Sequence, residues 1–300
     1  MTPVFHYSAP EAGMTVEDLL LANGYSRNLI IDLKKSPSGL TIDKTHVYVT
    51  RQMEAGEVLT VQLPRETVSH KIVPTQMPLD ILYEDRDILV VNKAANVPIH
   101  PSQGHFSNSL ANGMAWYFAQ KGDHFTYRVI NRLDRDTTGL LILAKHGLSA
   151  CILSDMVKTR QIRRTYLAAV SGDIRQYGAC GVIDAPIARV DGSTIERQVD
   201  FIHGEPAVTH YRFLSYHPGL DASLLELQLE TGRTHQIRVH MKHTGYPLFG
   251  DFLYHPDYRY IGRQSLHSWK LAFSHPITKE PLSFAAAVPE DMQIFICAGL

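Results

Sequence analysis

The sequence predicts an α+β protein in which a small N-terminal module precedes a larger domain built on a β-sheet. Three observations lead to this prediction. The segment Leu224–Glu230 alternates apolar and polar residues, which is the pattern of a half-buried strand. Gly147–Lys158 instead spaces its apolar residues as a helix does. The first 65 residues contain two short helical patterns followed by a hairpin pattern.

The composition is that of an ordinary globular chain, and it argues against several classes of protein. Of the 300 residues, 44% are hydrophobic and 20% are charged, and no apolar run approaches the roughly 18 residues that span a bilayer. A signal peptide is not indicated. The three cysteines (Cys151, Cys180 and Cys297) lack metal-ligand spacing, which favours a reduced, cytoplasmic setting. Because the net charge is −1, any RNA-binding surface must be local.

The N-terminal module is expected to span residues 1–65. Val16–Gly24 has the pattern of an amphipathic helix closed by glycine, and Ser26 precedes a second helix, Arg27–Lys35. Leu40–Leu63 then alternates in strand fashion, with turns between its apolar stretches.

A polar segment without periodicity, residues 66–78, is expected to link this module to a domain at 79–300. In that domain the patterns predict helices and strands in mixed order, with a turn-rich stretch between the second helix and the later strands. The predicted elements are strands within Leu79–Lys93, a helix at Ser109–Gln120, a helix at Gly147–Lys158, strands at Thr165–Ser171, Val208–Tyr216 and Leu224–Glu230, and a closing hairpin at Leu266–Ala286; the turn-rich stretch is Gly172–Pro206.

The densest polar stretch of the chain is Asn131–Gly139. It lies between two apolar segments, Val129–Ile130 and Leu140–Ala144, and contains two arginines, two aspartates and two threonines. Loops held by a rigid scaffold often carry catalytic groups. A charged turn with an Asx-type cap is the alternative interpretation.

A second polar stretch, Thr231–Gly245, follows the alternating strand. Thr234 is expected to cap a helix that runs to about Thr244. Arg233 would then lie at the helix entrance and Arg238 one turn inside it, both near one site. The histidines here do not indicate zinc, because His235 and His240 would lie about 140° apart on the helix and no carboxylate motif accompanies them.

These residues limit the chemistry that the chain can support. The sequence has no glycine-rich phosphate loop, no Gly-x-Ser-x-Gly elbow and no cysteine beside a plausible base. What remains is cofactor-free chemistry on a carboxylate that an arginine holds in place. Such a carboxylate can attack, stabilise or deprotonate at a sugar carbon, which indicates an enzyme that acts on a sugar or nucleoside.

The motifs resemble those of the RluA-type family of RNA pseudouridine synthases. Arg132–Gly139 is similar to the catalytic motif of that family, His-Arg-Leu-Asp-x-x-Thr-Ser-Gly, with Asn131 and Thr138 in place of the histidine and the serine. The resemblance implies a mixed, largely antiparallel central sheet with flanking helices and loops. Further similar segments follow in the order of the family: Leu82–Lys93, Arg164–Gly172, Gly204–Tyr211, Thr231–His240 and Pro247–Tyr254.

The resemblance also implies a role for particular residues. Asp134 matches the aspartate that frees uracil from its ribose before the base reattaches through carbon 5, and Arg238 matches the basic residue that pairs with it. Tyr166 matches a tyrosine that stacks on the flipped base and can take a proton. Arg132 matches an arginine that fills the gap left by the extruded uridine. Further contacts with the RNA are expected from Arg233, Thr137, His235 and Leu266, whereas Asp136 is expected to support the loop.

The implied function is that of an isomerase converting specific uridines of structured ribosomal or transfer RNA to pseudouridine. RNA is the expected partner; no membrane, metal or small-molecule cofactor is expected, and the protein should be a monomer. An inactive RNA-binding paralogue is the alternative, and a carboxylate glycosidase is a third possibility. Residues 1–65 resemble the α-L RNA-binding module of a small-subunit ribosomal protein at Gly24–Arg27 and Ala55–Val61, although Asp32 and Asp43 dilute its positive face.

Overall fold

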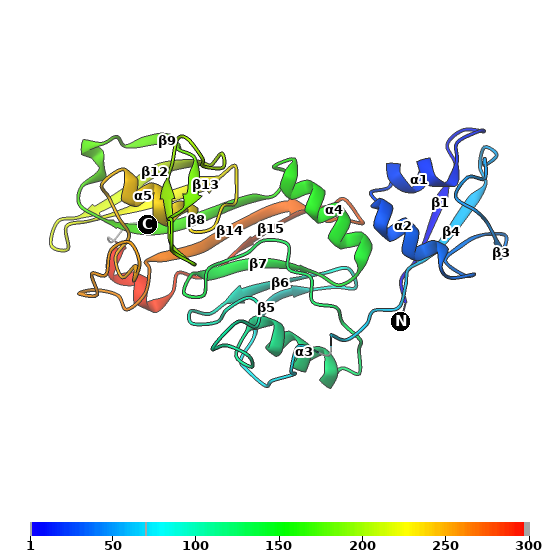
Figure 1. Ribbon diagram of the computed structural model, residues 1–300, viewed down its shortest axis with the longest axis horizontal. Helices are drawn as coiled ribbons and strands as arrows, with labels where there is room; N and C mark the ends of the chain where they lie inside the picture. Colours follow the sequence, from blue (N-terminus) through cyan, green and yellow to red (C-terminus); the bar gives the residue numbers. More distant parts are fainter. Residues whose placement is uncertain (1, 70, 297–300) are drawn as a thin grey trace.

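The computed structural model describes residues 2–69 and 71–296, and its centre is a nine-stranded sheet (Figure 1). The strand order is β5–β6–β7–β14–β8–β13–β12–β9, with β15 paired to β14. Among the described strands, β7 and β14 pair in parallel and all other neighbours are antiparallel. The sheet is therefore mixed and largely antiparallel, as predicted. Its strands are β5 (Asp80–Glu84), β6 (Ile88–Lys93), β7 (Thr138–Ala144), β8 (Arg163–Ser171), β9 (Cys180–Asp184), β12 (Val208–His217), β13 (Ala222–Leu229), β14 (Leu266–Ser274) and β15 (Pro281–Ala285).

Helices cover both faces of this sheet. One face packs against α3 (Leu110–Gln120) and α5 (Gln236–His243), while the other packs against α4 (Gly147–Lys158) and the 3₁₀ helix η2 (Glu290–Phe295). Every residue of β7 is buried, which is expected of a strand covered on both sides. The polar stretch Asn131–Gly139 therefore runs directly into a strand that is buried along its whole length.

The N-terminal residues form a separate four-stranded sheet, and their apolar core also includes Leu148 of α4. The order is β1–β4–β2–β3, and α1 and α2 begin at the caps Thr15 and Ser26. β1 was not predicted; it pairs with β4, whose residues lie 50 to 58 positions further along the chain, a contact that no local pattern encodes. The bounds are β1 (Val4–Ser8), α1 (Val16–Ala22), α2 (Arg27–Lys34), β2 (Leu40–Ile42), β3 (Thr45–His46) and β4 (Val58–Gln62).

The stretch Gly172–Pro206, predicted to be turn-rich, contains more regular structure than expected. It forms a 3₁₀ turn, the edge strand β9, and a separate two-stranded ribbon made of β10 (Ile187–Arg189) and β11 (Arg197–Val199). These strands were missed because they are short, with three to five residues each, and β9 also takes its partner, β12, from elsewhere in the chain. The 3₁₀ turn, η1, spans Ile174–Gln176.

The structure also describes the hydropathy of the helices and the state of two cysteines. Within the described residues, no helix is long and apolar enough to cross a membrane. Cys151 and Cys180 are free thiols, and Cys297 lies outside the described residues.

Candidate active site

The parallel pairing of β7 with β14 assembles the site. Because parallel neighbours begin at the same edge of a sheet, the loop before β7 meets the residues that lead into β14. Gly139 permits this close approach: its φ is +111°, and a Cβ there would collide with the backbone of Ser268. The antiparallel β8 then places Tyr166 opposite Ser268, on the same edge as the loop.

One pocket at this edge is lined by all eight residues that the sequence nominated. They come from the loop before β7, from β8, from the start of β14 and from the segment that leads into α5. The structure therefore brings together residues separated by more than a hundred positions. The eight are Asp134, Tyr166, Arg238, Arg132, Arg233, Thr137, His235 and Leu266.

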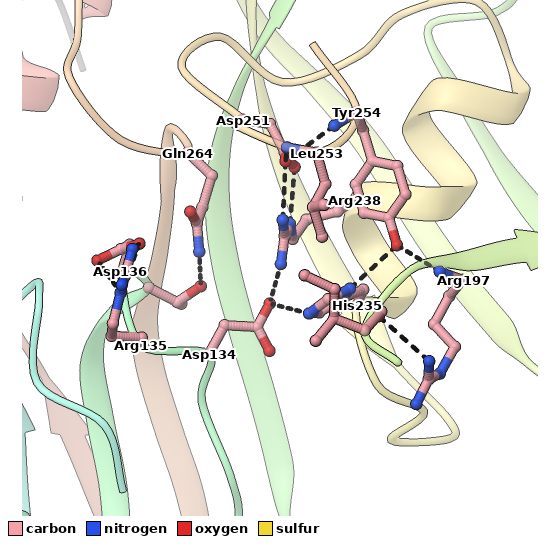
Figure 2. A network of polar contacts seen from close by, with 12 residues as sticks. Asp134, Arg135, Asp136, Arg197, His235, Arg238, Asp251, Leu253, Tyr254 and Gln264 are labelled. Carbon is pink, nitrogen blue, oxygen red and sulfur yellow. Dashed lines mark hydrogen bonds and ion pairs between the residues drawn. The ribbon is translucent and has the colours of Figure 1, made fainter. Parts of the chain in front are cut away.

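The centre of the pocket is an ion pair between Asp134 and Arg238 (Figure 2). Arg238 Nη1 donates to Asp134 Oδ2 at 2.8 Å, and His235 Nε2 lies 3.9 Å from the same oxygen. The arginine side chain is 1% exposed, whereas that of Asp134 is 26% exposed. Oδ1 of Asp134 has no hydrogen bond or ion pair to any described residue. One oxygen is thus held by the protein and the other is available to a ligand.

Asp251 fixes the orientation of Arg238, and sequence reasoning assigned this residue no role. Its two oxygens accept hydrogen bonds from Arg238 Nε and Nη2, each at 2.7 Å, and it is completely buried. The backbone N–H groups of Leu253 and Tyr254 also donate to Asp251 Oδ1. This fork leaves Nη1 of Arg238 for Asp134. The only sequence signal was the position of Asp251 inside the matched segment Pro247–Tyr254.

Arg238 remains charged between these two carboxylates. Burial opposes its charged form, but hydrogen bonds and charge interactions with Asp251 and Asp134 outweigh this effect and raise the pKa of Arg238 above its ordinary value. The rings of Tyr254 and Phe252 also face the guanidinium, at 5.0 and 5.5 Å. The pocket therefore contains a fixed positive charge beside a partly exposed carboxylate.

Comparison with known proteins identifies the family. The sequence profile of RNA pseudouridylate synthases matches residues 87–243. The chain is 43% identical to the RNA pseudouridine synthase YjbO of Bacillus subtilis (strain 168), over 94% of this chain and 98% of that protein. It is 38% identical to ribosomal large subunit pseudouridine synthase D of Zymomonas mobilis, over 79% and 78% of the two chains. The chain belongs to the RluA-type family of RNA pseudouridine synthases.

The fold agrees with this membership of an isomerase family. The solved structure of human RNA pseudouridylate synthase domain containing 1 is similar, with a TM-score of 0.58 and 27% identity, and the match covers 70% of this chain and 83% of that one. The matched profile includes Asp134, Tyr166 and Arg238. The central residues of the candidate site therefore lie within the matched range, whereas Leu266 and Asp251 follow it.

In this pseudouridine synthase two cations bind backbone carbonyls of the loop before β7. Lys93 Nζ donates to the carbonyl of Arg135 at 2.7 Å, and Arg263 Nη1 donates to the carbonyl of Asp136 at 3.1 Å. Burial lowers the pKa of Lys93 to about 7. The carboxylate of Asp136 pairs with Arg135 of the same loop and does not line the pocket.

Asn131, which stands where the family has histidine, also anchors the loop. It is buried; its side-chain amide donates to the carbonyl of Leu140 and its side-chain oxygen accepts from the N–H of Ile142. Both partners belong to β7, so Asn131 ties the loop to the strand that follows it. The departure from the family motif therefore keeps a hydrogen-bonding anchor at this position.

Tyr166 and Leu266 form apolar walls of the pocket. Both are nearly buried, and burial raises the pKa of Tyr166. At neutral pH the phenol therefore carries its proton and cannot accept another unless it first gives its own away. Tyr166 therefore presents a protonated ring to the pocket.

The helix that carries Arg238 starts later than predicted. Thr234 does not cap it; α5 begins at Gln236, and His235 precedes it in the left-handed conformation, with φ of 58°. The reason is the side chain of Gln236, whose oxygen accepts hydrogen bonds from the hydroxyl of Thr231 and the N–H of Arg233. These bonds close a polar turn before the helix and direct Arg233 and His235 towards the pocket.

The histidines of this segment are held by protein partners. Tyr254 Oη lies 3.0 Å from His235 Nδ1, and burial lowers the pKa of His235 so that it is neutral at pH 7. His240 contacts Thr209 Oγ1 and the carbonyl of Ala185 with its two ring nitrogens. Both ring nitrogens of His240 are therefore engaged with the protein.

A cluster of Asp85, Asp87 and His275 lies outside the pocket and has ligand types suited to a metal ion. His275 Nδ1 accepts from the N–H groups of Ile277 and Thr278, so the ring proton lies on Nε2, which contacts Asp85 at 2.8 Å. That nitrogen is a donor to a carboxylate and is not free to bind a metal. The cluster joins the β5–β6 turn to the end of β14.

Proposed function

We propose that the chain converts uridine in RNA to pseudouridine, with Asp134 as the catalytic carboxylate acting on a flipped-out nucleotide. The observation that carries this proposal is the Asp134–Arg238 pair, in which one carboxylate oxygen is held and the other is free beside a small pocket. Membership of the family supports the reaction type. The retained Asp134, Tyr166 and Arg238 argue against an inactive RNA-binding paralogue.

The proposed reaction is balanced without a co-reactant. The bond between ribose C1′ and uracil N1 breaks, the base rotates, and a bond forms between C1′ and C5. The hydrogen on C5 leaves to solvent, and N1 gains one. The free oxygen of Asp134 is the group that acts at the sugar, whether it attacks C1′ or removes a proton from the ribose. A glycosidase would instead release free uracil, so the identity of the product distinguishes the two reactions.

The pocket walls suit a single extruded base. Tyr166 and Leu266 supply apolar surface for the uracil ring, and Thr137 and His235 add polar edges. Flipping a nucleotide costs a few kcal/mol. Arg132 is exposed at the pocket rim and has no ion pair within the described residues, so its side chain is available to enter the stack and offset part of that cost.

Large-subunit ribosomal RNA is the proposed substrate. This choice rests on the relative from Zymomonas mobilis, which is named a ribosomal large subunit pseudouridine synthase; transfer RNA is the alternative. A ribosomal substrate implies a cytoplasmic enzyme. We further propose that it acts as a monomer, because all eight nominated pocket residues come from one chain.

Pseudouridine mapping tests this proposal. Cells that lack the protein should lose one or more pseudouridines in large-subunit ribosomal RNA. Wild-type protein should restore them, whereas Asp134→Asn, expressed at the same level, should not. Restoration by the Asn variant would contradict the role of Asp134, and losses confined to transfer RNA would overturn the substrate assignment.

A further inference from the structure

The two-stranded ribbon of β10 and β11 extends beside the active-site pocket. Ile187 of β10 pairs with Val199 of β11, and Arg189 pairs with Arg197. Ile187 packs with Val239 of α5 and with Tyr254 in a small apolar cluster. The ribbon is therefore anchored at one end to the helix that carries Arg238, while its two arginines lie towards its other end.

The arginine pair is unusual for a protein surface. Directly opposed like charges on antiparallel strands destabilise the pairing, and no described carboxylate forms an ion pair with Arg189 or Arg197. The guanidinium of Arg197 is hydrogen-bonded to the carbonyls of Ile195 and Glu196, which hold it in place without neutralising its charge. An anion between the two arginines would remove the repulsion.

These arginines line a groove that continues into the pocket. The groove has a volume of about 410 Å³. Arg132 and Arg233 line both the groove and the pocket, so the two spaces share a wall. Glu205, which pairs with Arg233, is the carboxylate among the lining residues. Four arginines against one glutamate give a concentrated positive charge in a chain whose net charge is −1.

Two hydrogen bonds and one longer polar contact connect the ribbon to Asp134 (Figure 2). The backbone N–H of Arg197 donates to Tyr254 Oη at 2.9 Å. The same hydroxyl lies 3.0 Å from His235 Nδ1, and His235 Nε2 faces Asp134. A ligand held by Arg197 would therefore lie at a defined distance from the reacting atoms.

We propose that this groove binds the phosphodiester backbone of nucleotides that flank the target uridine, with Arg189 and Arg197 as a phosphate clamp. The inference rests on the proposed function, because the uridine must occupy the adjoining pocket. Guanidinium groups bind phosphate oxygens through paired hydrogen bonds and stay charged at all working pH values. Because the net charge of the chain is −1, such a local clamp is the means of attracting RNA to this edge.

The salt dependence of RNA binding tests the clamp. The probe is large-subunit ribosomal RNA transcribed in vitro from the source organism, bound to full-length protein on the Asp134→Asn background so that no turnover occurs. The logarithm of the association constant falls linearly with the logarithm of the salt concentration, and the magnitude of this slope should decrease by about 0.7 to 1 for Arg189→Gln. For the double variant with Arg197→Gln the decrease should be about twice as large. Arg189→Gln is the sharper test, because that side chain has no described protein partner to lose.

Arg175→Gln is the matched control. Arg175 is exposed and its guanidinium pairs with Asp173, and Arg175 lines neither the groove nor the pocket. The salt slope of Arg175→Gln should therefore equal that of the Asp134→Asn protein. Unchanged slopes in both clamp variants, with unaltered melting temperatures, would overturn the clamp. If wild type instead binds RNA through these arginines but forms no pseudouridine, the proposed reaction fails and the groove assignment stands.

Discussion

A buried arginine shared by two carboxylates determines the geometry of the candidate site. Arg238 has three hydrogen bonds to Asp251 and Asp134, and Asp251 is the more buried of the two. Removing one partner of a buried charge leaves the other uncompensated, which costs roughly 3–5 kcal/mol. We therefore regard Asp251 as a positioning residue that acts through Arg238.

The variant Asp251→Asn tests this role. The amide keeps the size of the side chain but presents an NH₂ group to the guanidinium, so Arg238 should turn away from Asp134. A displacement of about 1 Å at a reacting group can cost about 10²-fold in rate. Single-turnover measurements at saturating RNA should show a loss of this size, with the dissociation constant for RNA nearly unchanged. A loss seen only in RNA binding would contradict the positioning role.

Lys93 should make stability depend on pH. Burial lowers the pKa of Lys93 from 10.5 to about 7, so between these values the unfolded chain binds a proton that the folded chain lacks. The free energy of unfolding should rise with pH across this window, by up to about 1.4 kcal/mol per pH unit from this group. Below pH 7 Lys93 is protonated in both the folded and the unfolded chain, so the folded protein bears the full free-energy cost of burying the charge.

Urea unfolding of Lys93→Met between pH 6 and 9 measures this contribution. Wild type should gain stability relative to the variant as the pH rises above 7, and Lys71→Met, at an exposed position, should run parallel to wild type. Parallel curves for wild type and Lys93→Met would show that Lys93 keeps an ordinary proton affinity.

At the scale of single residues, the sequence predicted which side chains form the candidate site. It did not predict which side chains fix their orientation. The motif of Asp134 and the segment of Arg238 could be recognised from residue order. The fork from Asp251 and the support from Lys93 depend on side chains that meet only after folding, so neither role follows from sequence spacing.

At the scale of elements, the pairing of β7 with β14 positions the loop that carries Asp134. Their parallel contact is limited to Thr138–Gly139 against His267–Ser268, and it needs a residue without a side chain at Gly139. The positive φ and the nearby backbone of Ser268 both oppose a Cβ.

Gly139→Ala should therefore lower both stability and activity. The strained φ alone costs of order 1–3 kcal/mol, and the collision with Ser268 adds to it by separating β7 from β14. Gly56→Ala is the control, because its φ is +83° but nothing lies within 4 Å of the added Cβ. In urea unfolding the Gly139 variant should lose clearly more stability than the control; equal losses would mean that the strands do not need this close approach.

Helices and central strands followed from the sequence because their patterns are local. Gly147–Lys158 and the strand before Glu230 appear close to where they were expected. Two of the missed strands depend on distant partners: β1 pairs with β4, and β9 pairs with β12. The start of α5 was placed too early because the side chain of Gln236, and not that of Thr234, organises the preceding turn.

At the scale of the whole molecule, the N-terminal sheet contacts α4 of the family domain (Figure 1). Leu148 of α4 is fully buried in the N-terminal core, and the ring of Phe5 lies 5.7 Å from that of His146. Cys151 Sγ donates to Ser26 Oγ across the same contact. We propose that residues 1–65 form a module docked on α4; its resemblance to the α-L RNA-binding module stays a prediction.

Thiol labelling of Cys151 tests the docking. Leu148→Ala should destabilise the packing of the N-terminal module on α4 by roughly 2–5 kcal/mol. Each loss of about 1.4 kcal/mol should raise the population of the undocked state about tenfold. The labelling rate of Cys151, read by mass spectrometry, should rise at least about tenfold. Val58→Ala, on an exposed position of β4, should leave the rate unchanged, and an unchanged rate in Leu148→Ala would contradict the docked arrangement.

Release of tritium from RNA labelled at uracil carbon 5 tests the central claim most directly, because only the formation of a C1′–C5 bond expels that hydrogen. Purified wild-type protein should release tritium from large-subunit ribosomal RNA taken from cells lacking the protein. Asp134→Asn should release about 10³-fold less or none, the range expected when a positioned catalytic group is removed. No release by wild type from ribosomal or transfer RNA, or equal release by the variant, would contradict the assignment of Asp134 as the catalytic carboxylate of an RNA pseudouridine synthase.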